Sequence, residues 1–220
     1  MILGIIIALI GVVSFSLANT INKFLSSRID TELFLTLQYT MITFIAAVVL
    51  LVSGEHFVLE VSHRDIWLIG IWGVIGYLGI WALIKGLSHL HTGVVMTVAY
   101  SYIFFSYFLN FFLLGDKERL SILSIIFAVA FFVAIGAFLF ARQSEGKTGA
   151  TKYIFLPIIT ALCWTVYFSF SNYFIKEGVM TPMQTKFYSE AIILIMSLFP
   201  LFLGTIDHKE NITKKNMGII

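Results

Sequence analysis

The sequence predicts an all-α membrane protein, a bundle of transmembrane helices built on an inverted repeat, and three observations lead to this fold class. Hydrophobic residues make up 59% of the 220 residues and charged residues only 12%, a composition outside the range of soluble globular domains. Seven stretches are long and apolar enough for a helix to cross a bilayer. A segment near the N-terminus also recurs later in the chain.

Each predicted crossing needs roughly 20 mostly apolar residues, because the hydrocarbon core is about 30 Å thick and a helix rises about 1.5 Å per residue. The apolar runs are continuous rather than alternating, which excludes barrel strands. We place the crossings at 3–24, 33–53, 66–86, 92–114, 120–141, 154–175 and 184–204.

The internal repeat appears when the sequence is shifted by 153 residues, which pairs 5–23 with 158–176 and gives nine identities in nineteen pairs. The polar identities are the most telling, because apolar matches between membrane helices are common. They are Ser16 with Ser169, Asn19 with Asn172 and Lys23 with Lys176.

Five helices per repeat is an odd number, so consecutive repeats would lie in the membrane in opposite orientations. We therefore divide the chain into a first five-helix repeat at 1–142, a linker at 143–153 and a truncated second repeat at 154–220. A complete second repeat would run to roughly residue 295. The expectation is a bundle with seven transmembrane helices present of an expected ten.

The shared polar residues have the spacing i, i+3, i+7, which places them on one helix face in both copies. In a functional interpretation, Asn19, Lys23, Asn172 and Lys176 line a wet interior and contact a polar or anionic ligand. In the alternative interpretation, the asparagines form interhelical hydrogen bonds and the lysines extend to the membrane surface.

Glu190 lies well inside the crossing at 184–204, where a charge costs roughly 2.5 to 3.5 kcal/mol on insertion scales. Either it faces a wet interior, where it could bind a cation or exchange a proton, or it pairs with Lys186 one turn earlier.

The crossing at 66–86 contains a glycine seam, which we expect to pack closely against the crossing at 92–114. The seam consists of Gly70, Gly73, Gly76 and Gly79. Beside it, Tyr77, Trp81 and Lys85 could line a pore. Trp67, Trp72 and Tyr153 are expected as anchors at the membrane interface. Tyr100 and Tyr102 belong to the most hydroxyl-rich crossing, which we expect to face the interior.

These features together resemble the EamA-type family of the drug/metabolite transporter superfamily. The resemblance rests on small and polar residues followed by Lys23 in the first crossing, and on a glycine-rich crossing that leads into Trp81-Ala82-Leu83-Ile84-Lys85. An acidic turn at Gly115-Asp116-Lys117-Glu118-Arg119-Leu120 and Gly136 complete it.

The resemblance implies an inverted-repeat transporter bundle that moves a small organic metabolite, such as an amino acid, by alternating access, in the direction of export. The candidate substrate-binding residues, chosen from the patterns above, are Asn19, Lys23, Trp81, Lys85, Tyr100, Tyr102, Asn172, Lys176 and Glu190. We expect a multi-pass protein of a bacterial or archaeal plasma membrane, with membrane lipid and a small-molecule substrate as partners; a homodimer is left open.

The alternatives are an intramembrane enzyme and a seven-helix receptor-like protein. An enzyme needs a nucleophile with its base, or clustered carboxylates or histidines, and we find no such arrangement and no catalytic residue in the sequence. The single cysteine, Cys163, lies inside a crossing, and no Cys/His spacing typical of a metal site occurs. We therefore expect no enzyme activity, no cofactor and no metal. The net charge of +2 is spread over short loops, so no nucleic acid is expected.

Overall fold

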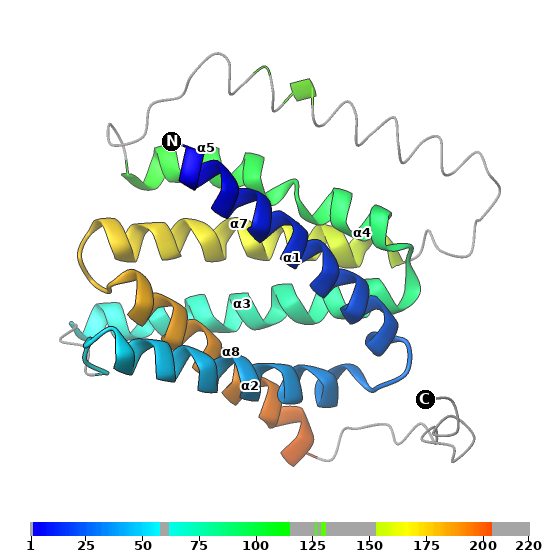
Figure 1. Cartoon of the computed structure of the whole chain (residues 1–220), viewed down its shortest axis with the longest axis horizontal. Coiled ribbons are helices and arrows are strands. Elements are labelled where there is room, and N and C mark those ends of the chain that lie inside the picture. Colours follow the sequence, from blue (N-terminus) through cyan, green and yellow to red (C-terminus); the bar gives the residue numbers. More distant parts are fainter. Residues whose placement is uncertain (1, 58–61, 115–125, 127–128, 131–152, 204–220) are drawn as a thin grey trace.

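The computed structural model describes residues 2–57, 62–114, 126, 129–130 and 153–203, and every long element in these ranges is an α-helix (Figure 1). The predicted all-α class is therefore confirmed. The helices are α1 (Ile2–Ser26), α2 (Thr31–Val52), α3 (His63–His89), α4 (Thr92–Ala99), α5 (Tyr102–Leu114), α7 (Phe155–Lys176) and α8 (Pro182–Phe202).

Four helical stretches among the described residues are long and apolar enough to cross a membrane, which supports a multi-pass membrane protein. They are Thr31–Val52, His63–His89, Thr92–Leu113 and Phe155–Lys176. The expected number of crossings and the division into repeats stay predictions. Nearly all of the crossing at 120–141, the linker at 143–153 and the chain after Leu203 lie outside the described residues.

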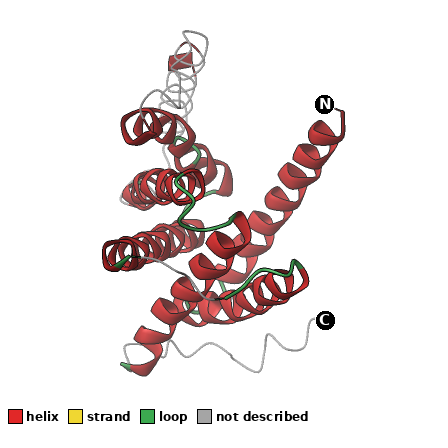
Figure 2. Ribbon diagram, turned by 90° about the vertical axis from the view of Figure 1, so that its left-hand side faces the viewer, coloured by secondary structure: helices red, strands yellow, loops and turns green. Residues whose placement is uncertain are grey.

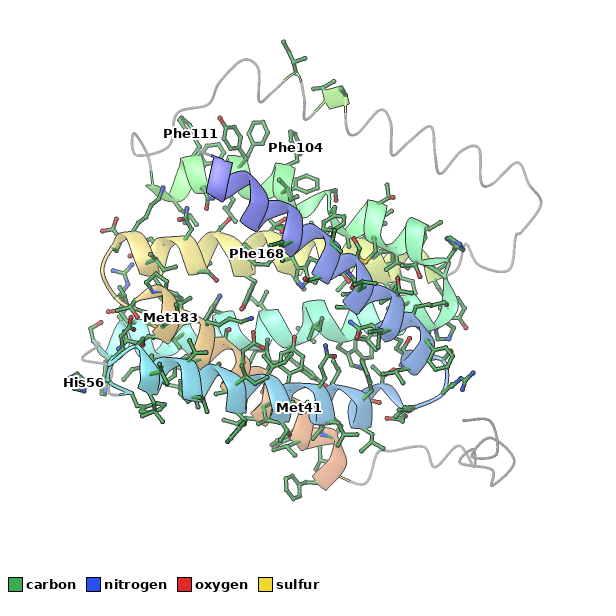
Figure 3. The ribbon with its side chains drawn as sticks, in the orientation of Figure 1. Met41, His56, Phe104, Phe111, Phe168 and Met183 are labelled. Carbon is green, nitrogen blue, oxygen red and sulfur yellow. The ribbon has the colours of Figure 1, made fainter. Side chains whose placement is uncertain are left out.

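The helices stack in layers, with α4 and α5 on α7, α7 on α3, and α3 on α2 and α8 (Figures 1 and 2). The most extensive pairings are α3 with α7 and α2 with α8. Helix α1 packs on α3, α2 and α4 at its C-terminal end and leans away from the stack toward its N-terminus (Figure 2). Large apolar side chains project outward from the bundle, including Met41 on α2 (Figure 3). This arrangement suits a lipid environment.

Helices α2 and α8 run antiparallel. Near the start of α2, Thr36 Oγ1 lies 3.2 Å from Ser197 Oγ, close to the end of α8. Beyond the end of α2, the main-chain oxygen of His56 accepts a 3.0 Å hydrogen bond from Gln184 near the start of α8. Figure 3 shows His56 and Met183 at the same end of the bundle. Opposite directions are what an inverted repeat requires of these corresponding helices.

Two glycines end helices with a left-handed backbone, which disfavours side chains because of the Cβ clash. Gly54 has φ of 74° after α2, and Gly178 has φ of 71° after α7. The following chain therefore turns back sharply, and the turn after Gly178 directs α8 against α2.

The crossing predicted at 92–114 is interrupted rather than continuous. Helix α4 ends at Ala99 and α5 begins at Tyr102. At the interruption the Ser101 amide donates to Val98 O over 3.1 Å, a bond to the third preceding residue instead of the fourth, and the Ser101 hydroxyl donates to the same oxygen over 2.7 Å. The hydroxyl thus competes for a carbonyl that a regular helix would use.

The glycine seam packs against α7 and α8, not chiefly against the crossing at 92–114 as predicted. A Cβ atom built on Gly76 would lie 2.8 Å from Cδ2 of Tyr167 on α7, and one on Gly73 would overlap Ile192 on α8. Gly70, in contrast, has nothing within 4 Å of that position. The prediction was right about close packing but wrong about the partner, because the seam faces helices remote in the sequence.

Candidate functional site

Trp81 connects two groups of opposite charge at one end of the bundle. Its indole Nε1 donates a 3.0 Å hydrogen bond to Glu32 Oε1, from the first turn of α2. The ammonium of Lys85, one helical turn further along α3, lies 4.7 Å from the centre of the Trp81 ring. This distance is typical of a cation–π contact. An acid, an aromatic face and a base therefore lie side by side on two helices.

Tyr100 and Tyr102 lie at the interruption between α4 and α5 and pack against the same hydrophobic cluster as Trp81. The Tyr102 ring stacks on Phe168 at 4.8 Å and meets Trp164 edge-on at 5.4 Å. Three of the predicted site residues, Trp81, Tyr100 and Tyr102, therefore pack against one hydrophobic cluster.

Lys23 binds main-chain oxygens at the end of α3. Its ammonium donates to Leu87 O and, over 3.0 Å, to Leu90 O. Carbonyl groups at a helix C-terminus lack intrahelical partners and carry partial negative charge, so a lysine there is favourable. In this structure the lysine holds α1 against α3.

Asn19 and Asn172 lie toward opposite ends of the bundle. Asn19 is buried one turn before Lys23, close to the C-terminal end of α3. Asn172 is half-buried and follows Ser171, whose hydroxyl accepts a 3.1 Å hydrogen bond from Trp72 in the first half of α3. Lys176 is exposed at the end of α7. The two Ser/Asn/Lys stripes thus end at opposite ends of the bundle.

Glu190 on α8 is buried, with a side chain only 5% exposed. Its Oε1 forms an ion pair with Lys186, whose side chain is 61% exposed. The sequence left open pairing with Lys186 or a wet surrounding, and the pairing is what the structure shows. The second carboxylate oxygen, Oε2, has no hydrogen-bond partner among the described residues.

The profile of the EamA-like transporter family matches residues 2–141, more than half of the chain. The chain belongs to the EamA-like transporter family. The searches of curated proteins and of solved structures find no match.

Membership in the EamA-like family confirms the predicted resemblance and agrees with the apolar helices in indicating a membrane transporter. It also makes an enzyme the less favoured interpretation, since the family is one of transporters.

Sequence reasoning on this EamA-like chain missed Glu32, Tyr39 and Tyr167. Glu32 looked like an ordinary acidic residue in a first helical turn, and only the fold brings Trp81 to it. Tyr39 and Tyr167 lie on different helices, yet both come within electrostatic range of Glu190. The polar character of 36–43 was the available signal, since Thr36, Gln38, Tyr39, Thr40 and Thr43 interrupt an otherwise apolar crossing.

Proposed function

We propose that this protein exports a small organic metabolite, such as an amino acid, across a bacterial or archaeal plasma membrane by alternating access. The observation that carries the proposal is the Glu32, Trp81 and Lys85 group, embedded in a bundle of apolar helices from a transporter family. Ionisable side chains are rare in such bundles because burying them is costly, and those present usually belong to functional sites. An acid and a base that both contact one indole therefore favour a binding role.

The chemistry of this group fits a zwitterion. A carboxylate such as Glu32 can accept hydrogen bonds from a substrate ammonium, and an ammonium such as Lys85 can donate to a substrate carboxylate. The Trp81 ring lies between them and offers an apolar and π-rich surface for a side chain. Tyr100 and Tyr102, which pack against the same hydrophobic cluster as Trp81, would add hydroxyl groups. An amino acid combines all three features.

The proposal is tested with the protein reconstituted in liposomes. Exchange of radiolabelled amino acids is measured for wild-type protein, Trp81→Ala and the control Trp67→Ala, whose side chain is 73% exposed. We expect exchange above empty liposomes for wild type and control, and a raised KM or lost exchange for Trp81→Ala. A wild type that exchanges no metabolite better than empty liposomes would overturn the proposal.

A further inference from the structure

The two oxygens of the Glu190 carboxylate differ in their surroundings. Oε1 is paired with the ammonium of Lys186, whereas the buried Oε2 has no hydrogen-bond partner among the described residues. A buried carboxylate oxygen without a partner is costly, because desolvation is not offset by a new hydrogen bond. Such an atom in a native fold calls for a physical explanation.

A second unpartnered oxygen lies on the facing helix. Thr43 Oγ1 on α2 is buried and likewise has no partner in the described part of the chain. Other threonines in these helices bond back to the fourth preceding carbonyl: Thr36 does so over 2.9 Å and Thr40 over 2.7 Å. Thr43 has therefore given up the local bond that its neighbours make.

The register of the two antiparallel helices brings these oxygens to the same level. Thr36 contacts Ser197 directly. Thr43 lies seven residues after Thr36, and Glu190 lies seven residues before Ser197. Seven residues are nearly two turns, about 10.5 Å along each helix. Both steps lead in the same direction and stay on the same helix face, which places Thr43 opposite Glu190.

Among the described residues, the groups on other helices that interact electrostatically with Glu190 carry hydroxyls. Tyr39 on α2 and Tyr167 on α7 lie within electrostatic range of Glu190, and Tyr167 also hydrogen-bonds with Ser189 on α8. From α3, Gly73 and Gly76 approach this region through Ile192 and Tyr167. In the part of the chain that the structure describes, the titratable groups found near Glu190 are thus Lys186 on its own helix and the two tyrosines on α2 and α7.

We propose that Glu190 is the proton-exchange site that couples a proton gradient to transport, an inference that rests on the proposed function. In the ionised state the carboxylate is paired with Lys186. When a proton arrives from the aqueous end that Lys186 faces, an O–H bond forms at Oε2 and the carboxylate loses its charge. The ion pair is then lost and the ammonium returns to water. The new O–H group donates to Thr43 Oγ1, which gives both of these oxygens a hydrogen bond; Gln38 Oε1, also buried and unpartnered on α2, is the other acceptor on that helix.

This exchange differs from binding of a metal cation. Lys186 already neutralises the ionised carboxylate, so a sodium ion at Oε2 would add a net positive charge to a buried site. A proton brings the same single charge, but it neutralises the carboxylate by a covalent bond, and the remaining positive charge stays on the exposed Lys186 ammonium. Closing the hydrogen bond to Thr43 also draws α8 and α2 together, which links protonation to the packing of two central helices.

The first test reads protonation directly and does not depend on transport. Infrared difference spectra between acidic and alkaline pH are recorded on the reconstituted protein. The sequence has twelve Asp and Glu residues, so the Glu190 contribution is the carboxylic acid C=O component that wild type shows and Glu190→Gln lacks when their difference spectra are compared. Its pH midpoint should move to lower pH in Thr43→Val, which removes the acceptor of the acid proton, and to higher pH in Lys186→Gln, which removes the partner of the carboxylate. A band unchanged in Glu190→Gln, or unmoved in both other variants, would overturn the proposal.

The second test separates coupling from substrate binding. Accumulation driven by a pH gradient and substrate exchange without a gradient are measured in the same liposomes. We expect Glu190→Gln to lose gradient-driven accumulation while its exchange becomes independent of pH. Loss of both activities in a monodisperse Glu190→Gln protein would instead make Glu190 a substrate contact and overturn proton exchange. If wild-type protein moves no substrate, the proposed function fails, and the infrared bands still decide the protonation of Glu190.

Discussion

The indole nitrogen of Trp81 and the carboxylate of Glu32, 49 positions apart in the sequence, form a 3.0 Å hydrogen bond between α3 and α2. This bond joins a central helix to the first turn of an outer one, next to the cation–π contact of Lys85. The same two side chains can therefore contribute to stability and to ligand binding, and substitutions can separate the two contributions.

Replacing Trp81 with phenylalanine keeps an aromatic ring but removes the N–H donor. We expect a loss of about 1.5 to 3 kcal/mol in stability, the range for hydrogen bonds to charged groups. Glu32→Gln should cost less, because an amide oxygen still accepts the bond. The measurement is unfolding of the detergent-solubilised protein by denaturant for the single and double variants. Strictly additive effects would show that the two residues are not coupled.

Replacing Gly73 with alanine should destabilise the packing of α3 against α8, since the added Cβ would overlap the branched side chain of Ile192. Gly70→Ala is the matched control in the same helix, because its new methyl group meets nothing within 4 Å. Alanine also favours helix by up to about 1 kcal/mol, so the control should be neutral or stabilised. Thermal melting of both variants compares them. Equal melting temperatures would contradict the close approach.

Replacing Lys23 with methionine leaves Leu87 O and Leu90 O without their ammonium donor while keeping most of the apolar stem. We expect a loss of about 1 to 3 kcal/mol, and faster proteolysis of the loop between α3 and α4. Lys176→Met, at the exposed end of α7, should change stability less. A larger loss for Lys176→Met would reverse the roles assigned to the two lysines.

Alternating access predicts that Asn19 and Asn172 exchange exposure to opposite sides of the membrane. In a Cys163→Ala background, single cysteines at these positions are labelled with a membrane-impermeant thiol reagent. Asn19 is only 3% exposed here, whereas Asn172 is half-buried, so position 172 should react faster without substrate. Substrate should change the two rates in opposite directions. Parallel changes, or no reaction at either position, would favour asparagines that only join helices.

Much of the fold could be predicted because lipid imposes a simple pattern on sequence. The predicted crossing at 33–53 is α2 to within two residues, and 154–175 is α7 to within one. Such runs need no knowledge of tertiary contacts, since each helix satisfies its own main chain. The interruption in 92–114 was missed, because Tyr100 and Ser101 carry no proline or glycine that would mark it.

The candidate site was harder to predict because its geometry depends on which helices become neighbours. Trp72 was expected at the membrane interface, yet it is 1% exposed and donates a 2.9 Å hydrogen bond to Tyr167 O. An indole satisfies its N–H equally well at an interface or against a carbonyl of another helix, and sequence does not separate the two. The partners of Trp81 and of Lys23 were hidden for the same reason.

The interruption between α4 and α5 gives this layer of the bundle a hinge. A continuous helix resists bending because each turn is closed by its ladder of main-chain hydrogen bonds, whereas two short rods joined near Ser101 can reorient with few bonds lost. Helix α5 lies along α7, while α4 meets α1, α3 and α7. A tilt of one layer against the next can therefore be accommodated at this interruption. Tyr100 and Tyr102 lie at the interruption, so bending there would reposition the aromatic groups that are proposed to contact the substrate.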